Sequence, residues 1–241
     1  MIGVIGLGRF GRLAVKYLVK DQPVCVYTPS GRYDEIEALG AKPVSFAEVC
    51  IQDIVLLCVP ISKFAENVEY AAPFIRPGAL VVDVCSVKEY PVACMRKYLP
   101  EHAQILATHP MFGPDSAAVS LCGAKIVLCP ERVDAERYQQ IKVCLEAKGL
   151  EIIETTPEEH DRETARSLAL PHFIGRGMEA MGLAPLEIDT EGFKRLLHVM
   201  GVVTHDTWQL FMDMQTYNRF AAIARREFMA ALNQVEDKIN A

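Results

Sequence analysis

Two short polar stretches carry side chains that could move protons. Residues 83–88, Asp-Val-Cys-Ser-Val-Lys, and residues 108–116, Thr-His-Pro-Met-Phe-Gly-Pro-Asp-Ser, each follow an apolar run of strand length. Ligands of open α/β sheets bind beyond the carboxyl ends of the strands, so we expect both stretches at that edge. A histidine there, His109, is well placed for proton transfer near neutral pH. From the residues alone, His109 could equally make a structural hydrogen bond.

A glycine-rich segment at the start of the chain has the spacing of a dinucleotide-binding loop. Residues 6–11, Gly-Leu-Gly-Arg-Phe-Gly, lie between an apolar run and an amphipathic segment, where a strand would turn into a helix. In that setting Gly6 permits a tight turn, Gly8 lets the backbone approach a pyrophosphate, and Gly11 allows close packing of helix on sheet. The helix N-terminus offers free N–H groups to the phosphates. The predicted cofactor-binding residues of this loop are Gly6, Leu7, Gly8, Arg9, Phe10 and Gly11.

The end of the second predicted strand bears on the choice between NAD and NADP. NAD-specific sites usually place a carboxylate there, against the ribose 2′-hydroxyl. This chain has Thr28, Ser30 and Arg32 instead, and no acid before Asp34. Hydroxyls and a guanidinium suit a 2′-phosphate, which a guanidinium can bind with two hydrogen bonds. The sequence therefore favours NADP, with NAD possible, while the alternative for Arg32 is a solvated residue at the start of a helix.

The elements that position these residues alternate between apolar runs and amphipathic segments. This alternation extends from residue 2 to residue 154 and is typical of a parallel sheet covered by helices. We therefore expect an α/β fold, with a doubly wound Rossmann-type dinucleotide-binding domain at residues 1–155. Residues 156–241 are expected to form an all-helical substrate and dimerisation domain, with long helices over residues 158–181 and 190–231. Its apolar positions outnumber what so small a unit can bury, which predicts a homodimer, or else packing on the first domain.

Composition argues against several classes of protein. Hydrophobic residues make up 51% and charged residues 23%, the balance of a globular protein. The net charge of −6, without basic runs, does not predict nucleic-acid binding, and no apolar run approaches the roughly 20 residues that span a bilayer. The eight cysteines contain no Cys-x-x-Cys pair, so no metal site or disulfide framework is expected. Because the first predicted strand begins at Ile2, we expect no targeting peptide and a cytoplasmic location.

Together the motifs resemble those of the prephenate and arogenate dehydrogenases of tyrosine biosynthesis, the TyrA-type enzymes. The matching segments keep the family's order and spacing: residues 6–11, 83–89, 108–114 and 159–161. Residues 192–197 and 210–218 look most like the plant-type arogenate branch. The resemblance implies an NAD(P)-dependent oxidative decarboxylation that leaves an aromatic ring. It further implies that His109 takes the substrate hydroxyl proton and that Ser86 hydrogen-bonds the same hydroxyl.

Substrate contacts follow in part from the same resemblance. Asp115 could pair with the ammonium of arogenate and would repel the keto acid prephenate, so arogenate is favoured. Lys88 could face a substrate carboxylate or solvent, and His172 matches a family position facing the cleft or is a satisfied histidine at a domain interface. No residue is an obvious partner for the carboxylate on the substrate ring, because Val202 stands where the microbial enzymes commonly carry an arginine that binds it. The available cations are Lys194, Arg195, Arg176 and Arg219.

Two other functions share part of this pattern. Related β-hydroxyacid and imine dehydrogenases have the glycine loop and a helical second domain, but they usually use a lysine of the helical domain. A non-catalytic NADP-binding regulatory module would bind cofactor without turning over a cyclohexadienyl substrate.

Overall fold

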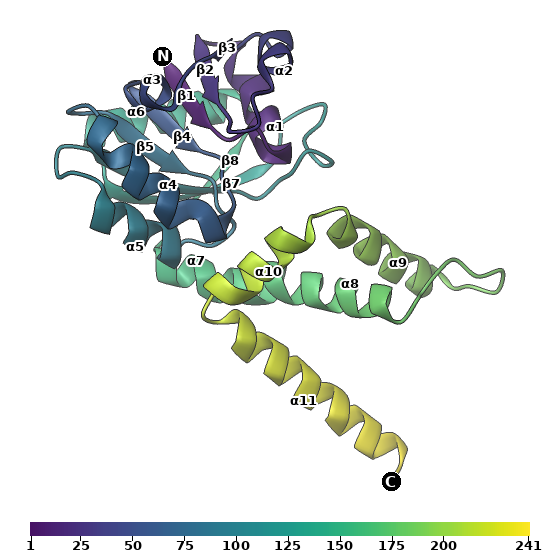
Figure 1. Ribbon diagram of the computed structural model, residues 1–241. Coiled ribbons are helices and arrows are strands. Elements are labelled where there is room, and N and C mark those ends of the chain that lie inside the picture. The colour runs from purple at the N-terminus through teal and green to yellow at the C-terminus, as the bar shows by residue number, and fades with distance from the viewer. The chain divides into compact units, whose positions relative to one another are not determined.

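The computed structural model describes all 241 residues and divides into two compact units, Met1–Pro157 and Glu158–Ala241. The first unit contains every strand, and the second consists of helices (Figure 1). The division lies two residues beyond the predicted boundary, after the proline that opens the first helix of the second unit.

The first unit is built on an eight-stranded sheet in the order β3-β2-β1-β4-β5-β6-β7-β8. Strands β1 to β6 are parallel, and the order reverses between β1 and β4, which confirms the doubly wound Rossmann-type fold. The strands are β1 Ile2–Ile5, β2 Val24–Tyr27, β3 Lys42–Pro43, β4 Ile54–Leu57, β5 Leu80–Asp83, β6 Gln104–Pro110, β7 Lys125–Arg132 and β8 Glu151–Glu154.

One strand departs from the expected parallel arrangement. Strand β7 runs antiparallel to β6, with His109 opposite Val127, and β8 is parallel to β7. The reason is the connection at residues 111–124, which contains no helix. A parallel neighbour needs a crossover, usually helical, whereas a chain that turns back directly must pair antiparallel.

Helices cover both faces of the sheet. On one face, Leu13 of α1 and Tyr138 of α6 share a core cluster with Leu80 and Leu106 of the central strands. On the other face, α3 lies against β1, and α4 and α5 continue the layer (Figure 1). The helices of this unit are α1 Arg9–Leu18, α2 Tyr33–Ala38, α3 Phe46–Cys50, α4 Phe64–Ala71, α5 Glu89–Tyr98 and α6 Ala135–Ala147.

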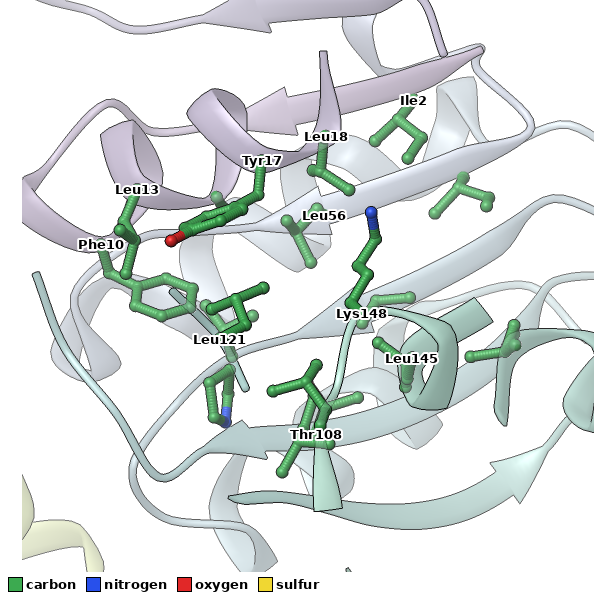
Figure 2. Close-up of a pocket in the computed structure, with 18 of the residues that line it drawn as sticks. Ile2, Phe10, Leu13, Tyr17, Leu18, Leu56, Thr108, Leu121, Leu145 and Lys148 are labelled. Atoms are coloured by element: carbon green, nitrogen blue, oxygen red, sulfur yellow. The ribbon is translucent and has the colours of Figure 1, made fainter. Parts of the chain in front are cut away.

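A cavity remains between α1 and α6, over the middle of the sheet. It has about 940 Å³ of empty space, part of it open to solvent, and side chains such as Phe10, Leu13, Leu56 and Leu145 line it (Figure 2). Because its walls are almost entirely apolar, this cavity does not suit the phosphates of a dinucleotide. A dinucleotide site is expected at the carboxyl ends of the strands instead.

The second unit is a chain of helices that differs from prediction in one respect. A single long helix is expected over residues 190–231, but three are found, because Thr207 caps a new helix by accepting a hydrogen bond from the Leu210 N–H at 3.2 Å. A second break follows at Asn218, whose Oδ1 accepts from the Phe220 N–H at 2.9 Å. The helices are α7 Pro157–Thr164, α8 Leu170–Ala180, α9 Glu191–Thr204, α10 Trp208–Tyr217 and α11 Ala221–Ile239, with a π-helical turn Ala165–Ala169 between α7 and α8. No helix in the structure combines the length and apolarity needed to cross a membrane.

Candidate active site

The glycine loop connects β1 to α1 at the point where the strand order reverses. Gly6 has a φ of 101°, and a Cβ there would lie 2.3 Å from the Cys58 carbonyl oxygen. A Cβ on Gly11 would lie 2.3 Å from the Gly6 carbonyl oxygen, so helix and loop can touch only through glycine. A Cβ on Gly8, in contrast, would meet nothing within 4 Å, so its backbone faces open space.

That open space lies at the N-terminus of α1. Gly8 is the N-cap residue, and as a glycine it has no side chain that could cap the helix. An uncapped helix N-terminus beside an approachable backbone fits the pyrophosphate of a dinucleotide. The other loop residues have different partners. The Leu7 side chain is buried in the core, and the Phe10 ring lies 6.2 Å from the ring of Phe112.

The residues predicted to contact the ribose gather at the end of β2. The Thr28 and Ser30 hydroxyl oxygens are 3.0 Å apart. Nη1 of Arg32 donates a hydrogen bond to the Leu7 carbonyl at 3.3 Å, so its guanidinium lies beside the glycine loop. Arg32 is also the N-cap residue of α2, with 41% of its side chain exposed, so it fits both the predicted ribose contact and a residue at the start of a helix.

A buried ion pair joins the two stretches that contain Ser86 and His109. Asp83 ends β5, and Lys88 lies five residues later; both side chains are completely buried. The Lys88 ammonium donates to the Asp83 carboxylate and to the Thr108 carbonyl. Asp83 also accepts from the Cys85 and Thr108 N–H groups, at 2.9 and 3.2 Å. Burial raises the pKa of the Asp83 carboxyl, and the Lys88 ammonium opposes that rise.

This network changes the role expected of Lys88. Its ammonium is enclosed and already bonded, so it is not available to a substrate carboxylate or to solvent. It fastens the loop 84–88 to the end of β6 instead. Sequence reasoning missed the partnership because the Thr108 carbonyl is 20 residues away along the chain.

Ser86 lies between Asp83 and Lys88 in the chain, and His109 follows Thr108, whose carbonyl Lys88 binds. Asp83 is in register with Ala107, so β6 extends past the end of β5 and carries His109 beyond it. The His109 side chain is buried, with 6% of the residue exposed. The Ser86 Oγ is buried without a hydrogen-bond partner. A buried hydroxyl left unpaired is costly, so Ser86 is a candidate for a hydrogen bond to a ligand.

The thiols near this edge are poor nucleophiles. Burial raises the pKa of the Cys58 thiol to about 12, and it raises the pKa of Cys85 as well. A thiol that stays protonated reacts slowly, so neither cysteine is a good nucleophile at this edge.

The loop that follows His109 is attached to α1 by contacts the sequence did not predict. Arg9 donates to both Asp115 carboxylate oxygens, at 2.9 and 2.8 Å, and the Tyr17 hydroxyl donates to the Ala117 carbonyl at 2.8 Å. Arg9 and Asp115, predicted to bind cofactor and substrate respectively, are therefore paired with each other. Both remain partly exposed, so a ligand can still reach either group.

Within the helical unit, the predicted substrate contacts fall into two groups. His172 is buried on α8, its Nδ1 has no hydrogen-bond partner, and its Nε2 is 3.9 Å from an Asp206 carboxylate oxygen. Burial lowers the pKa of His172, with Asp206 opposing the shift. The nearby Arg176 donates to the Asp206 carbonyl at 2.5 Å. Lys194 and Arg195, at the start of α9, pair instead with the neighbouring acids Asp189 and Glu191.

Comparison with known families matches both units. The family described as "Prephenate dehydrogenase, nucleotide-binding domain" matches residues 31–154, and "TYRAAT1-like, C-terminal domain" matches residues 178–241. The chain belongs to the prephenate dehydrogenase family. The matched residues 31–154 include Arg32, the Asp83–Lys88 pair, Ser86 and His109.

Two related plant proteins are named arogenate dehydrogenases. The chain is 35% identical to "Arogenate dehydrogenase 2, chloroplastic" of Arabidopsis thaliana over 228 residues, which are 90% of this chain and 63% of that protein. It is 30% identical to "Arogenate dehydrogenase 1, chloroplastic" of the same plant, over 99% of this chain and 39% of that protein. The chain thus spans less than two thirds of the length of these relatives.

Solved structures of the family share the fold. An arogenate dehydrogenase from Synechocystis is 24% identical with a TM-score of 0.73, over 99% of this chain and 91% of that one. A prephenate dehydrogenase from A. aeolicus, in complex with hydroxyphenyl propionate and NAD+, is 21% identical with a TM-score of 0.78, over 98% and 89%.

Proposed function

We propose that this chain catalyses the NAD(P)-dependent oxidative decarboxylation of a cyclohexadienyl acid, with arogenate and NADP preferred. The observation that carries the proposal is the buried, unpartnered Ser86 hydroxyl beside a network that also holds the end of β6, next to His109. Formation of an aromatic product by the purified chain, with one carbon dioxide released for each cofactor reduced, tests it. Cofactor binding without turnover would instead favour a regulatory module.

In this reaction the protein moves one proton. His109, as a neutral imidazole, takes the proton of the ring hydroxyl, and Ser86 hydrogen-bonds the same oxygen and orients it. The open backbone at Gly8 and the N-terminus of α1 would hold the pyrophosphate. The nicotinamide, when bound, supplies the hydride acceptor. Loss of carbon dioxide then makes the ring aromatic.

The preference for NADP rests on the end of β2. Thr28 and Ser30 offer hydroxyls where an NAD-specific site would have a carboxylate, and Arg32 is held beside the glycine loop. A guanidinium in that position favours a 2′-phosphate over a 2′-hydroxyl.

The preference for arogenate rests on Asp115. In the structure its carboxylate is paired with Arg9, so the substrate ammonium has to share or replace that partner. We expect Asp115→Asn to lower kcat/KM for arogenate by about tenfold, the scale of one charge-assisted hydrogen bond, and to leave kcat/KM for prephenate unchanged or higher. Steady-state kinetics with both substrates measure this. Equal preference in Asp115→Asn and in the wild type would contradict the assignment; Glu101→Gln, an exposed carboxylate elsewhere, is the control.

The remaining assignments are proposals about the helical unit and its surroundings. Apolar side chains exposed along α9 and α11 support a homodimer through this unit, which light scattering of the purified chain would test: Leu196, Val199, Val202, Met229, Leu232 and Val235. Substrate contacts by His172, Lys194 and Arg195, and the cytoplasmic location, stay predictions.

A further inference from the structure

Two arginines from different elements converge on one carboxylate near the end of β2. Arg12 of α1 pairs through Nε with one oxygen of Glu35, and its Nη2 lies 3.4 Å from the other. Nη1 of Arg32 lies 3.7 Å from that second oxygen. Hydrogen bonding to Arg12, ahead of the charge of Arg32, lowers the pKa of Glu35, so this group is a carboxylate at neutral pH.

The position of this cluster connects it to the cofactor. Arg32 also donates to the carbonyl of Leu7, inside the glycine loop, and Arg12 follows Gly11 directly in the first turns of α1. The cluster is part of the first unit alone, and its three side chains are each between a third and a half exposed. A ligand held by the glycine loop would therefore find both guanidinium groups accessible.

We propose that Arg12 and Arg32 together form a binding site for a phosphate monoester on the cofactor ribose, and that Glu35 occupies this site when the phosphate is absent. The inference rests on the proposed use of NADP and assigns two residues, Arg12 and Glu35, beyond those expected from the sequence. A carboxylate and a phosphate present similar oxygen pairs to a guanidinium, so one can replace the other.

The cofactor phosphate should displace the Glu35 carboxylate from the two arginines. A phosphate monoester carries roughly −1.5 to −2 charges at neutral pH and three acceptor oxygens, so it can bind both guanidinium groups more strongly than one carboxylate does. Glu35 keeps the two arginines in place before the cofactor binds, but its own negative charge opposes the phosphate. Removing the charge of Glu35 should therefore strengthen phosphate binding, and removing Arg12 should weaken it.

Calorimetric titration of the full chain with adenosine 2′,5′-bisphosphate and with 5′-AMP tests this, because the two probes differ only in the 2′-phosphate. We expect Arg12→Gln to weaken binding of the bisphosphate by about tenfold, as for one charge-assisted hydrogen bond to a partly exposed anion, with no change for 5′-AMP. Glu35→Gln should strengthen binding of the bisphosphate severalfold and again leave 5′-AMP unchanged. Glu37→Gln removes the same charge from the same helix, α2, and should leave both affinities as in the wild type.

The outcomes separate this inference from the proposed cofactor preference. If the wild type binds 5′-AMP as tightly as the bisphosphate, both the NADP preference and the proposed phosphate site are wrong. If the wild type prefers the bisphosphate but Arg12→Gln binds it equally well, the two-arginine site alone is overturned. An unchanged affinity in Glu35→Gln would overturn the role of that carboxylate as a competitor.

Discussion

Replacing His109 with alanine is expected to lower kcat by between about a hundredfold and about ten-thousandfold, the range over which a positioned general base acts. The substrate hydroxyl would then lose its proton only to water, while the glycine loop and the end of β2 are unchanged. Dissociation constants for NADP and NAD should therefore stay at the wild-type values. Rapid-mixing kinetics with calorimetric titration of the cofactor measure both quantities.

Two further variants separate a catalytic role from a structural one. His109→Asn keeps a polar side chain at a buried position, so it should fold with near-native stability and still lose activity. His102→Asn is the matched control: His102 precedes β6 at its opposite end, where Nε2 lies 3.0 Å from the Ile75 carbonyl oxygen. Near-native kcat in His109→Asn would contradict the assignment of His109 as the base.

Replacing Lys88 with methionine is expected to destabilise the chain by about 3–5 kcal/mol, the scale for leaving one member of a buried ion pair without its partner. Asp83 would remain enclosed, with only N–H groups and no cation to stabilise its charge. Because the same pair fastens the loop of Ser86 to the end of β6, kcat should also fall, even in the fraction that is folded. Urea denaturation and kinetics measured below the transition test the two effects.

The loss of stability in Lys88→Met should be larger at high pH than at low pH. Burial raises the pKa of Asp83, and without Lys88 nothing of positive charge opposes the rise. A carboxyl whose folded pKa is raised contributes stability at low pH that is lost as the pH rises through that pKa. The variant should thus be closer to the wild type at about pH 5 than at about pH 8.

An exposed pair supplies the control. Lys63 and Glu66 lie 3.1 Å apart with 63% and 72% of their side chains exposed, so Lys63→Met should cost less than about 1 kcal/mol at either pH. A loss in Lys88→Met as small as in Lys63→Met would show that the Asp83–Lys88 pair does not support the site.

The features predictable from sequence are those encoded by short stretches. The spacing of Gly6, Gly8 and Gly11 predicts a tight strand-to-helix turn. In the structure, a Cβ at Gly6 or Gly11 would collide with a backbone carbonyl oxygen, as that turn requires. The alternation of apolar runs with amphipathic segments predicted the parallel strands of the sheet. Because parallel strands end at a common edge, Ser86 and His109 are expected near each other from the sequence alone.

What escaped prediction depends on contacts between distant residues. Arg9 and Asp115 are separated by 106 positions, and no local pattern indicates that they pair. Lys88 looked available because a lysine after a strand usually faces water, whereas the pairing of β5 with β6 encloses it. The break before α10 is different: Thr207 has the side chain of an N-cap, and that signal was present but lay within an apolar pattern.

The most direct test of the proposed function is a set of four initial-rate measurements on the purified chain, pairing arogenate or prephenate with NADP or NAD. The proposal predicts the highest kcat/KM for arogenate with NADP, with formation of tyrosine and carbon dioxide in equal amounts. Turnover of neither substrate with either cofactor, by a chain that binds NADP, would contradict it.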